Sequence, residues 1–194
     1  MRRYELTDTQ FELLKPYLPP SGMPGHPWAE HRPILNGIFW KLRTGAPWRD
    51  VPERYGPWQT RYDRFVWWRR DGSWNRMLEA LQIVLDANGK LDWEQWNIDG
   101  TSIRATRAAA GARADGQDDD EPADHALGRA VGGFSTKLHL ISDGNGLPLN
   151  ATLTKGQAHE STQFEATVEP IVIKRRRTNR IRRHPKRLAG DRAY

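Results

Sequence analysis

The spacing of apolar residues changes once along this chain, near Trp93, and this change constrains the fold more than any other feature. Up to about residue 90, apolar side chains recur every three or four positions, as on one face of an amphipathic helix. Beyond Trp93 they alternate with polar residues or form short runs, which is typical of strands. We therefore predict an α+β protein, with a helical domain over 1–90 and an α/β domain over 91–194.

Capping residues and helix breakers give the boundaries in the first domain. Thr7 and Gln10 form a capping box, and Gly45 is placed to end the helix before it. Helices are predicted at about 8–18, 30–44, 48–55, 58–71 and 73–88, with a turn at 56–57.

The second domain is expected to contain a hairpin and a long loop. The sequence Asp-Gly-Asn-Gly at 143–146 lies between two alternating segments and predicts a tight turn. Residues 106–132 are rich in Ala, Gly and charge without apolar periodicity, so we expect a loop. Strands are predicted at 95–105, 134–142, 147–154 and 187–190, with a helix capped by Ser161 that ends near Val172.

Asp99 and Asp191 each follow a short apolar stretch that is typical of a buried strand. The predicted order is strand, two antiparallel strands, helix, strand, as in a ribonuclease H-like fold. There the first and fourth strands lie side by side and bring the two carboxylates together. Paired carboxylates form a hard oxygen site for Mg²⁺ or Mn²⁺, which can act on a phosphodiester. The alternative for either residue alone is a turn former or a helix cap.

The composition agrees with a nucleic-acid partner. The 194 residues carry a net charge of +6 and have a pI near 9.8, which favours a polyanion. The absence of cysteine excludes disulfides and thiol catalysis. No apolar run approaches the roughly 20 residues of a membrane span. We expect a cytoplasmic, nucleoid-associated protein with no membrane partner.

Five segments resemble insertion-sequence transposases of the IS-five group, within the IS-four/IS-five superfamily. Segments 42–60 and 64–72 are similar to the N-terminal domain of that group, and segments 132–140, 156–161 and 190–194 to its catalytic domain. The resemblance implies a DDE transposase that binds the terminal inverted repeats of its element and joins cleaved strands to target DNA, with Mg²⁺ (or Mn²⁺) as cofactor. It implies that Asp99 and Asp191 are the first two catalytic, metal-binding acids, and that the protein is a homo-oligomer in the synaptic complex.

The third acid of that family, a Glu on a helix well beyond the second Asp, has no counterpart in the sequence, which stops three residues after Asp191. We therefore expect a truncated or frame-interrupted transposase, or part of a longer protein. The alternative function is an inactive transposase that acts only as a DNA-binding protein or repressor. His159 and Glu160 precede a predicted helix, and we expect them either to cap it or to support the metal ligands. Glu160 as the third ligand is the least favoured alternative.

A helix-turn-helix is predicted from the helix at 48–55, the turn at 56–57 and the helix at 58–71. On the last helix we expect Tyr62, Phe65 and Val66 to face inward. Outside that stripe lie the residues that we expect to contact DNA: Gln59, Arg61, Arg64 and Arg69. The alternative is a solvated polar face.

A basic stretch without any acid runs from Lys174 to Arg187, shortly before Asp191. We expect Arg175 and Arg176 in this stretch to contact DNA phosphates near the active site. The alternative is a solvated charged segment.

Overall fold

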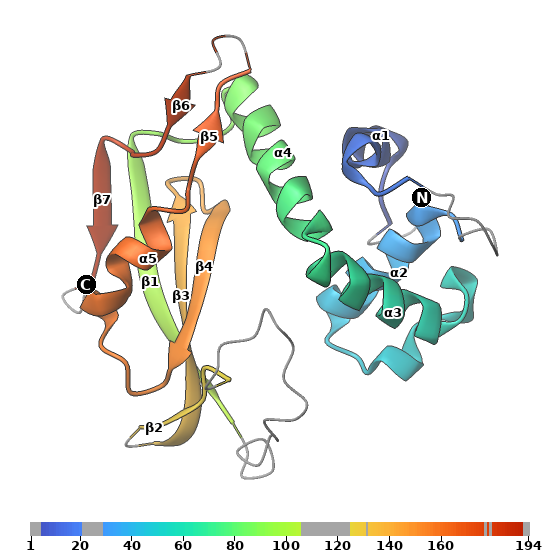
Figure 1. Cartoon of the computed structure of the whole chain (residues 1–194), viewed down its shortest axis with the longest axis horizontal. Coiled ribbons are helices and arrows are strands. Elements are labelled where there is room, and N and C mark those ends of the chain that lie inside the picture. Colours follow the sequence, from blue (N-terminus) through green and yellow to red (C-terminus); the bar gives the residue numbers. More distant parts are fainter. Residues whose placement is uncertain are drawn as a thin grey trace. The chain divides into compact units, whose positions relative to one another are not determined.

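The computed structural model describes residues 5–20, 29–105, 125–130, 132–176, 178 and 180–191. The chain divides into two compact units, Met1–Leu81 and Gln82–Tyr194, each with its own hydrophobic core (Figure 1). The first is helical and the second is built on a mixed β-sheet, so the predicted α+β class is confirmed. The boundary falls inside helix α4 (Ser73–Ala87), because Ile83 and Leu85 pack into the core of the second unit.

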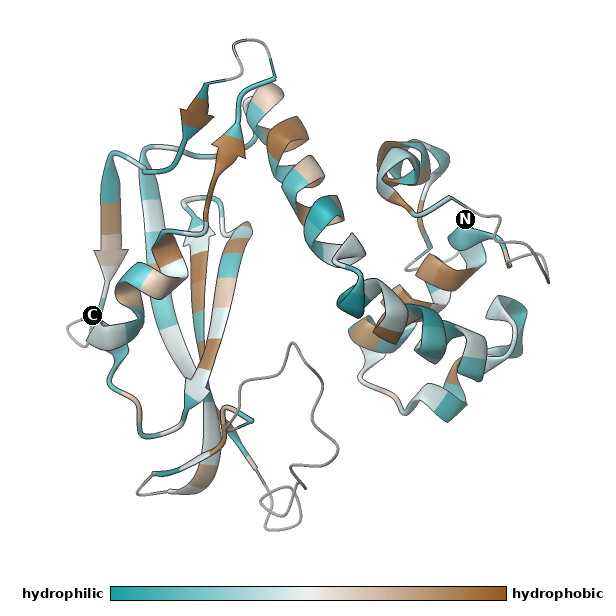
Figure 2. Cartoon of the chain, in the orientation of Figure 1, coloured by the Kyte–Doolittle hydropathy of each residue, from teal (hydrophilic) through white to brown (hydrophobic). Residues whose placement is uncertain are grey.

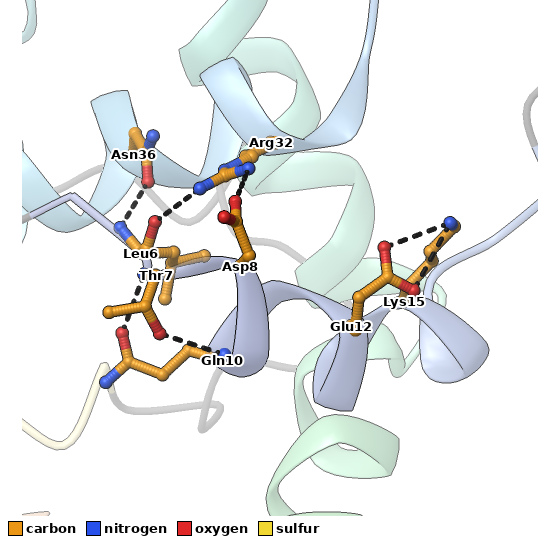
Figure 3. A network of polar contacts seen from close by, with 8 residues as sticks. All are labelled: Leu6, Thr7, Asp8, Gln10, Glu12, Lys15, Arg32 and Asn36. Atoms are coloured by element: carbon orange, nitrogen blue, oxygen red, sulfur yellow. Dashed lines mark hydrogen bonds and ion pairs between the residues drawn. The ribbon is translucent and has the colours of Figure 1, made fainter. Parts of the chain in front are cut away.

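The helical unit begins with a short helix that is tied to its neighbour by polar contacts (Figure 3). The predicted capping box is present: the Thr7 hydroxyl accepts from Gln10 N–H at 3.1 Å, and the Gln10 side chain accepts from Thr7 N–H at 2.9 Å. Leu6 N–H donates to Asn36 Oδ1 at 2.9 Å, and Arg32 donates to the Leu6 carbonyl at 2.9 Å. The elements are α1 (Asp8–Leu14), the 3₁₀ turn η1 (Lys15–Tyr17), α2 (His31–Thr44), η2 (Trp48–Asp50), η3 (Glu53–Tyr55), α3 (Trp58–Arg70) and the first part of α4.

The helix predicted at 48–55 is wrong, because two separate 3₁₀ turns, η2 and η3, occupy this stretch. Val51 and Pro52 lie between them with extended backbone, at ψ 123° and 137°. Proline disfavours helical backbone in the residue before it and has no N–H to donate, so a continuous helix is interrupted here. The connection from α2 to α3 is therefore 45–57, longer than the three or four residues of a typical helix-turn-helix.

The core of the helical unit is aromatic. Trp68 is fully buried and meets Trp74 edge to face, with 5.5 Å between ring centroids, and Phe65 lies 5.8 Å from Trp74. Phe65 faces the core as predicted, but Tyr62 is 43% exposed, so its predicted inward position is wrong. The inward face of α3 carries Arg61, Arg64 and Trp68 instead, at helical spacing.

The sheet of the second unit has five strands, with β1 and β3 in its interior. β1 pairs antiparallel with β3 and parallel with β7, while β2 and β4 both pair antiparallel with β3. The strands are β1 (Gln95–Arg104), β2 (Gly128–Ala130), β3 (Gly133–Asp143), β4 (Pro148–Lys155) and β7 (Arg187–Gly190). β2 lies in the stretch predicted as a loop, so that prediction is wrong for 128–130, whereas 106–124 lies outside the described residues.

One face of this sheet is covered. Trp96, Ile98 and Ile141 are buried there with Val168 and Ile171 in a single cluster. The hydropathy of the ribbons alternates along β3 and β4 (Figure 2), but the register places His139, not Leu140 or Leu153, on the same face as Ile141. The opposite face carries Ile103, Leu140 and Leu153, which are 52%, 38% and 47% exposed. The sheet thus has one buried face and one open face among the described residues.

The predicted helix 161–172 is shorter than expected. It consists of a 3₁₀ turn, η6 (Glu160–Gln163), and α5 (Phe164–Val168), and its cap is His159 rather than Ser161. A small hairpin that the sequence did not predict follows, formed by β5 (Ile173–Lys174) and β6 (Ile181–Arg182). It lies in the basic stretch, beyond the end of the sheet at which β7 begins (Figure 1).

Candidate active site

Asp99 and Asp191 occupy equivalent positions on two neighbouring parallel strands. β1 and β7 are in register from Gln95↔Arg187 to Ile98↔Gly190, and the two aspartates are the next residues on each chain segment. Neighbouring strands lie about 4.8 Å apart, so the register brings the two residues side by side. The sheet therefore places together two residues that are separated by more than ninety positions in the sequence.

Strand alternation directs the Asp99 side chain to the open face. Asp99 pairs with Leu140, which is partly exposed, whereas its neighbours Ile98 and Ile141 pair on the covered face. Asp99 and Asp191 are both exposed, and Asp99 Oδ1 accepts from Gly100 N–H at 2.8 Å. The carboxylates are thus held by a rigid sheet and accessible to solvent.

The donor set fits a hard divalent cation. Two carboxylates offer the oxygen ligands that Mg²⁺ and Mn²⁺ prefer. Within the described ranges there is no group of three or more His, Cys, Asp or Glu side chains able to hold a metal ion. The described part of the site consists of the two aspartates alone.

His159 and Glu160 make contacts that stabilise the turn leading into η6. Glu160 Oε1 forms an ion pair with Lys137 Nζ at 3.0 Å, and both side chains are largely buried. Lys137 also donates to the Ala158 carbonyl at 3.1 Å, while His159 Nδ1 accepts from Ser161 N–H at 3.4 Å. These contacts hold the turn that enters η6. Support of the metal ligands by His159 or Glu160 stays a prediction.

Lys137 points to the covered side of the sheet, whereas Asp99 points to the open side. Its partner in β1 is Ser102, an odd number of positions from Asp99, and strand side chains alternate between faces. The Lys137–Glu160 pair was missed from the sequence, because no local spacing relates two residues that only the chain reversal after β4 brings together.

His139 is fully buried on this covered face. Its Nε2 lies 2.8 Å from the Thr154 hydroxyl across the β3–β4 pair. Burial, together with the Lys137 ammonium, lowers the pKa of His139, although the Glu160 carboxylate acts in the opposite direction. Its imidazole is therefore held neutral inside the sheet unit.

In the helical unit, the expectation that Arg61 and Arg64 lie on an exposed face is wrong. They are 4% and 9% exposed, because α3 turns them towards the core beside Trp68. Arg61 Nη1 donates to the Pro57 carbonyl at 3.3 Å, and Arg64 Nη1 donates to His31 Nδ1 at 3.2 Å. Burial lowers the pKa of both guanidinium groups, and the charge of Arg61 lowers that of Arg64 further.

Gln59 and Arg69 lie on the exposed side of α3, together with Tyr62 and Asp63. Tyr62 and Asp63 lie three and four positions after Gln59, and Arg69 lies seven positions after Tyr62. The four side chains therefore lie on one side of the helix and form a stripe along it. Of the four residues predicted to contact DNA from α3, these two remain on an accessible surface.

Arg175 and Arg176 are also exposed, at the end of β5. The hairpin lies at the start of β7 and Asp191 follows the end of this four-residue strand (Figure 1), and contact of Arg175 and Arg176 with DNA phosphates near the active site stays a prediction. β7 carries the chain away from the hairpin before Asp191 is reached, so the hairpin and Asp191 lie at opposite ends of this strand.

Comparison with known proteins agrees with this arrangement. The family model "Transposase DDE domain" matches residues 97–194, from the strand of Asp99 to the end of the sequence. The model "Putative transposase of IS4/5 family (DUF4096)" matches residues 6–78, which cover most of the helical unit. The chain therefore belongs to the DDE transposases of the IS4/5 family, and the resemblance stated above is confirmed.

Two relatives match parts of the chain. "Uncharacterized protein y4sN" of Sinorhizobium fredii is 36% identical over 110 residues, which are 56% of this chain and 82% of the relative. "Insertion element IS402 uncharacterized 16.2 kDa protein" of Burkholderia cepacia is 34% identical over 110 residues, 53% of this chain and 75% of the relative. No solved structure matches the chain. Among the residues that the structure describes, no helix is long and apolar enough to cross a membrane.

Proposed function

We propose that this chain is a DNA transposase that cleaves and transfers strands of an insertion element. The observation that carries the proposal is the parallel register of β1 and β7, which sets Asp99 beside Asp191 at an accessible position of the sheet. This strand arrangement supports a ribonuclease H-like catalytic domain in a chain of the DDE family.

Asp99 and Asp191 would hold Mg²⁺ or Mn²⁺ through their carboxylate oxygens. When bound, the metal supplies charge stabilisation at the attacking and leaving oxygens of a phosphodiester. The contribution of the chain is rigidity, because both aspartates are attached to paired strands.

We assign DNA recognition to the helical unit. The exposed stripe of α3, with Gln59 and Arg69, offers an amide and a guanidinium that can bind base edges or phosphates. Terminal inverted repeats of the element are the proposed specific sites, and Arg61 and Arg64 would support α3 from inside the unit.

The metal site is tested by titration of the full chain with Mn²⁺ in an isothermal calorimeter. We expect weak binding by the two carboxylates and at least a tenfold loss of affinity in Asp99→Asn and in Asp191→Asn. The matched control is Glu94→Gln, an exposed acid just before β1 that pairs with Lys186. It should leave Mn²⁺ affinity unchanged.

Unchanged affinity in Asp99→Asn would contradict the shared site. A loss in Glu94→Gln as large as in Asp99→Asn would point to nonspecific attraction of the cation instead. Thermal unfolding of each variant, without metal, separates loss of a ligand from loss of the fold.

A further inference from the structure

The β5–β6 hairpin collects basic side chains on a framework fixed to the sheet unit. We propose that this hairpin is a sequence-independent phosphate-binding surface for duplex DNA, separate from the Asp99–Asp191 pair. The partner rests on the proposed function, whereas the surface itself rests on the following contacts.

The hairpin is an ordered element. Ile173 and Lys174 pair with Arg182 and Ile181, and Arg175 N–H donates to the Arg180 carbonyl at 2.9 Å. Ile173 is fully buried in the core of the sheet unit. One leg of the hairpin is thus anchored next to the exposed side chains of Lys174 and Arg175.

Arg182 serves as a second anchor. Its guanidinium lies 4.0 Å from the centroid of the Trp93 ring, a cation–π contact. Burial, with the nearby charge of Arg175, lowers the pKa of Arg182, while Asp86 and Glu94 act in the opposite direction. Arg182 therefore faces the protein, and the basic residues around it face outward.

The two acids near this anchor already have partners. Asp86 Oδ1 accepts from Trp93 Nε1 at 2.7 Å, and Glu94 pairs with Lys186 at 2.7 Å. The sequence from 170 to 190 contains no Asp or Glu. Five exposed cations of the hairpin and its flanks therefore face solvent without an acid from their own segment: Lys174, Arg175, Arg176, Arg180 and Arg183.

This surface fits a polymer of phosphates better than a single anion. Its cations are exposed and spread along both legs of the hairpin. Guanidinium groups bind phosphate oxygens strongly, and contacts to phosphates carry no information about the bases. Binding should therefore be sequence-independent and strongly dependent on salt.

The hairpin lies away from the metal-site aspartates. Arg182 contacts Trp93, which precedes β1, whereas Asp99 lies four residues after the first residue of β1, about 13 Å along the strand at about 3.3 Å per residue. Successive phosphates of one DNA strand advance about 3.4 Å along the helix axis. A duplex that lies along β1 would thus meet the hairpin about four base pairs or more from the aspartates.

The test is the salt dependence of DNA binding by the full chain, measured by fluorescence anisotropy with a labelled duplex of arbitrary sequence. For Arg175→Gln/Arg176→Gln we expect the slope of log K against log[salt] to become shallower by about two, with an affinity loss of about 60-fold at 0.1 M salt. The loss should be the same for any duplex sequence, and Arg175→Lys/Arg176→Lys should retain most of the slope.

The matched control is Arg104→Gln/Arg129→Gln, which removes two exposed strand arginines at the other end of the sheet. Its slope should stay within a few tenths of wild type. An equal slope change in control and hairpin variants, or none in the hairpin variant, would overturn the inference while leaving the proposed transposase function standing. Wild-type chain that binds no duplex DNA would overturn both. If the double hairpin variant unfolds, Arg183→Gln decides the question with an expected slope change of about one.

Discussion

At the scale of single residues, the most informative finding is that two arginines of α3 belong to a core. Arg61 packs against Gly56, whose backbone has φ +88°, and a Cβ at that position would lie 2.7 Å from the Arg61 guanidinium. Only glycine combines this conformation with this close approach. Arg61 Nε has no hydrogen-bond partner in the described part of the chain. Arg61 therefore contributes mainly through packing and its bond to Pro57, and it holds the turn from which α3 starts.

His31 gives the helical unit a defined pH dependence. Its Nε2–H donates to the Pro19 carbonyl at 2.9 Å, which leaves Nδ1 to accept from Arg64. Burial lowers the pKa of His31, and the charge of Arg64 lowers it further, although the bond to Pro19 raises it. The folded state therefore favours the neutral ring.

We predict that His31 titrates below about 6.5, the ordinary histidine value, in an NMR pH titration of its ring protons. The unfolded chain then binds a proton at higher pH than the folded chain, so stability is full above about 6.5 and is lost as the pH falls below it. The urea midpoint of unfolding, followed by tryptophan fluorescence, should fall as the pH is lowered below about 6.5. It should fall less in His31→Gln. A His31 midpoint above the ordinary value would contradict the neutral-ring assignment.

At the scale of elements, strand pairing and a turn carboxylate create the frame of the site. Asp143 at the end of β3 is fully buried, and its carboxylate accepts three backbone N–H groups, from Asp92, Asn145 and Leu147, at 2.8–3.0 Å. It thereby closes the β3–β4 turn and fixes the segment that leads into β1. Asp143 thereby helps to fix the start of the strand that carries Asp99.

We predict that Asp143→Ala destabilises the sheet unit by about 2–4 kcal/mol, because it leaves buried N–H groups without acceptors. Asp143→Asn should be intermediate, since its amide retains one acceptor oxygen. Urea unfolding measures the loss, and Asn145→Ala serves as the control, because it retains the backbone N–H that bonds to Asp143. Stability of Asp143→Ala within 0.5 kcal/mol of wild type, roughly the range of ordinary surface substitutions, would contradict this role.

At the scale of the whole molecule, exposed positive and negative charges lie at different proposed sites. The chain carries a net charge of +6, with exposed cations on the β5–β6 hairpin, while two exposed carboxylates stand at the proposed metal site. Without metal these carboxylates repel the phosphates that the hairpin attracts.

We predict that Asp99→Asn/Asp191→Asn binds duplex DNA several-fold more tightly than wild type in EDTA, because two like charges are removed from the DNA path. Adding Mn²⁺ should strengthen wild-type binding and leave the variant nearly unchanged. Anisotropy at low salt, where screening is weakest, measures both effects. The control is Glu165→Gln/Glu169→Gln, which removes two exposed acids at α5 that belong neither to the site nor to the hairpin, and equal tightening in that control would reduce the effect to net charge.

Much of the chain was predictable from local patterns. The capping box at Thr7, the ends of α2, α3 and α4, the β3–β4 hairpin and β1 follow from spacing and turn residues, because these signals act within a few positions of the chain. The helix predicted at 48–55 failed at Pro52, and the loop predicted at 106–132 failed at β2. A three-residue strand has too few positions to show a period.

The sequence by itself determined the α+β class, the family and the two aspartates as a candidate pair. The order of elements predicted that the strands of Asp99 and Asp191 lie side by side, but only the tertiary structure gave the register between β1 and β7, since hydrogen bonds between distant strands leave no local signal. It also decided which face of α3 is buried. Aromatic rings and long guanidinium stems can both fill a core, and the choice depends on what the neighbouring helices present.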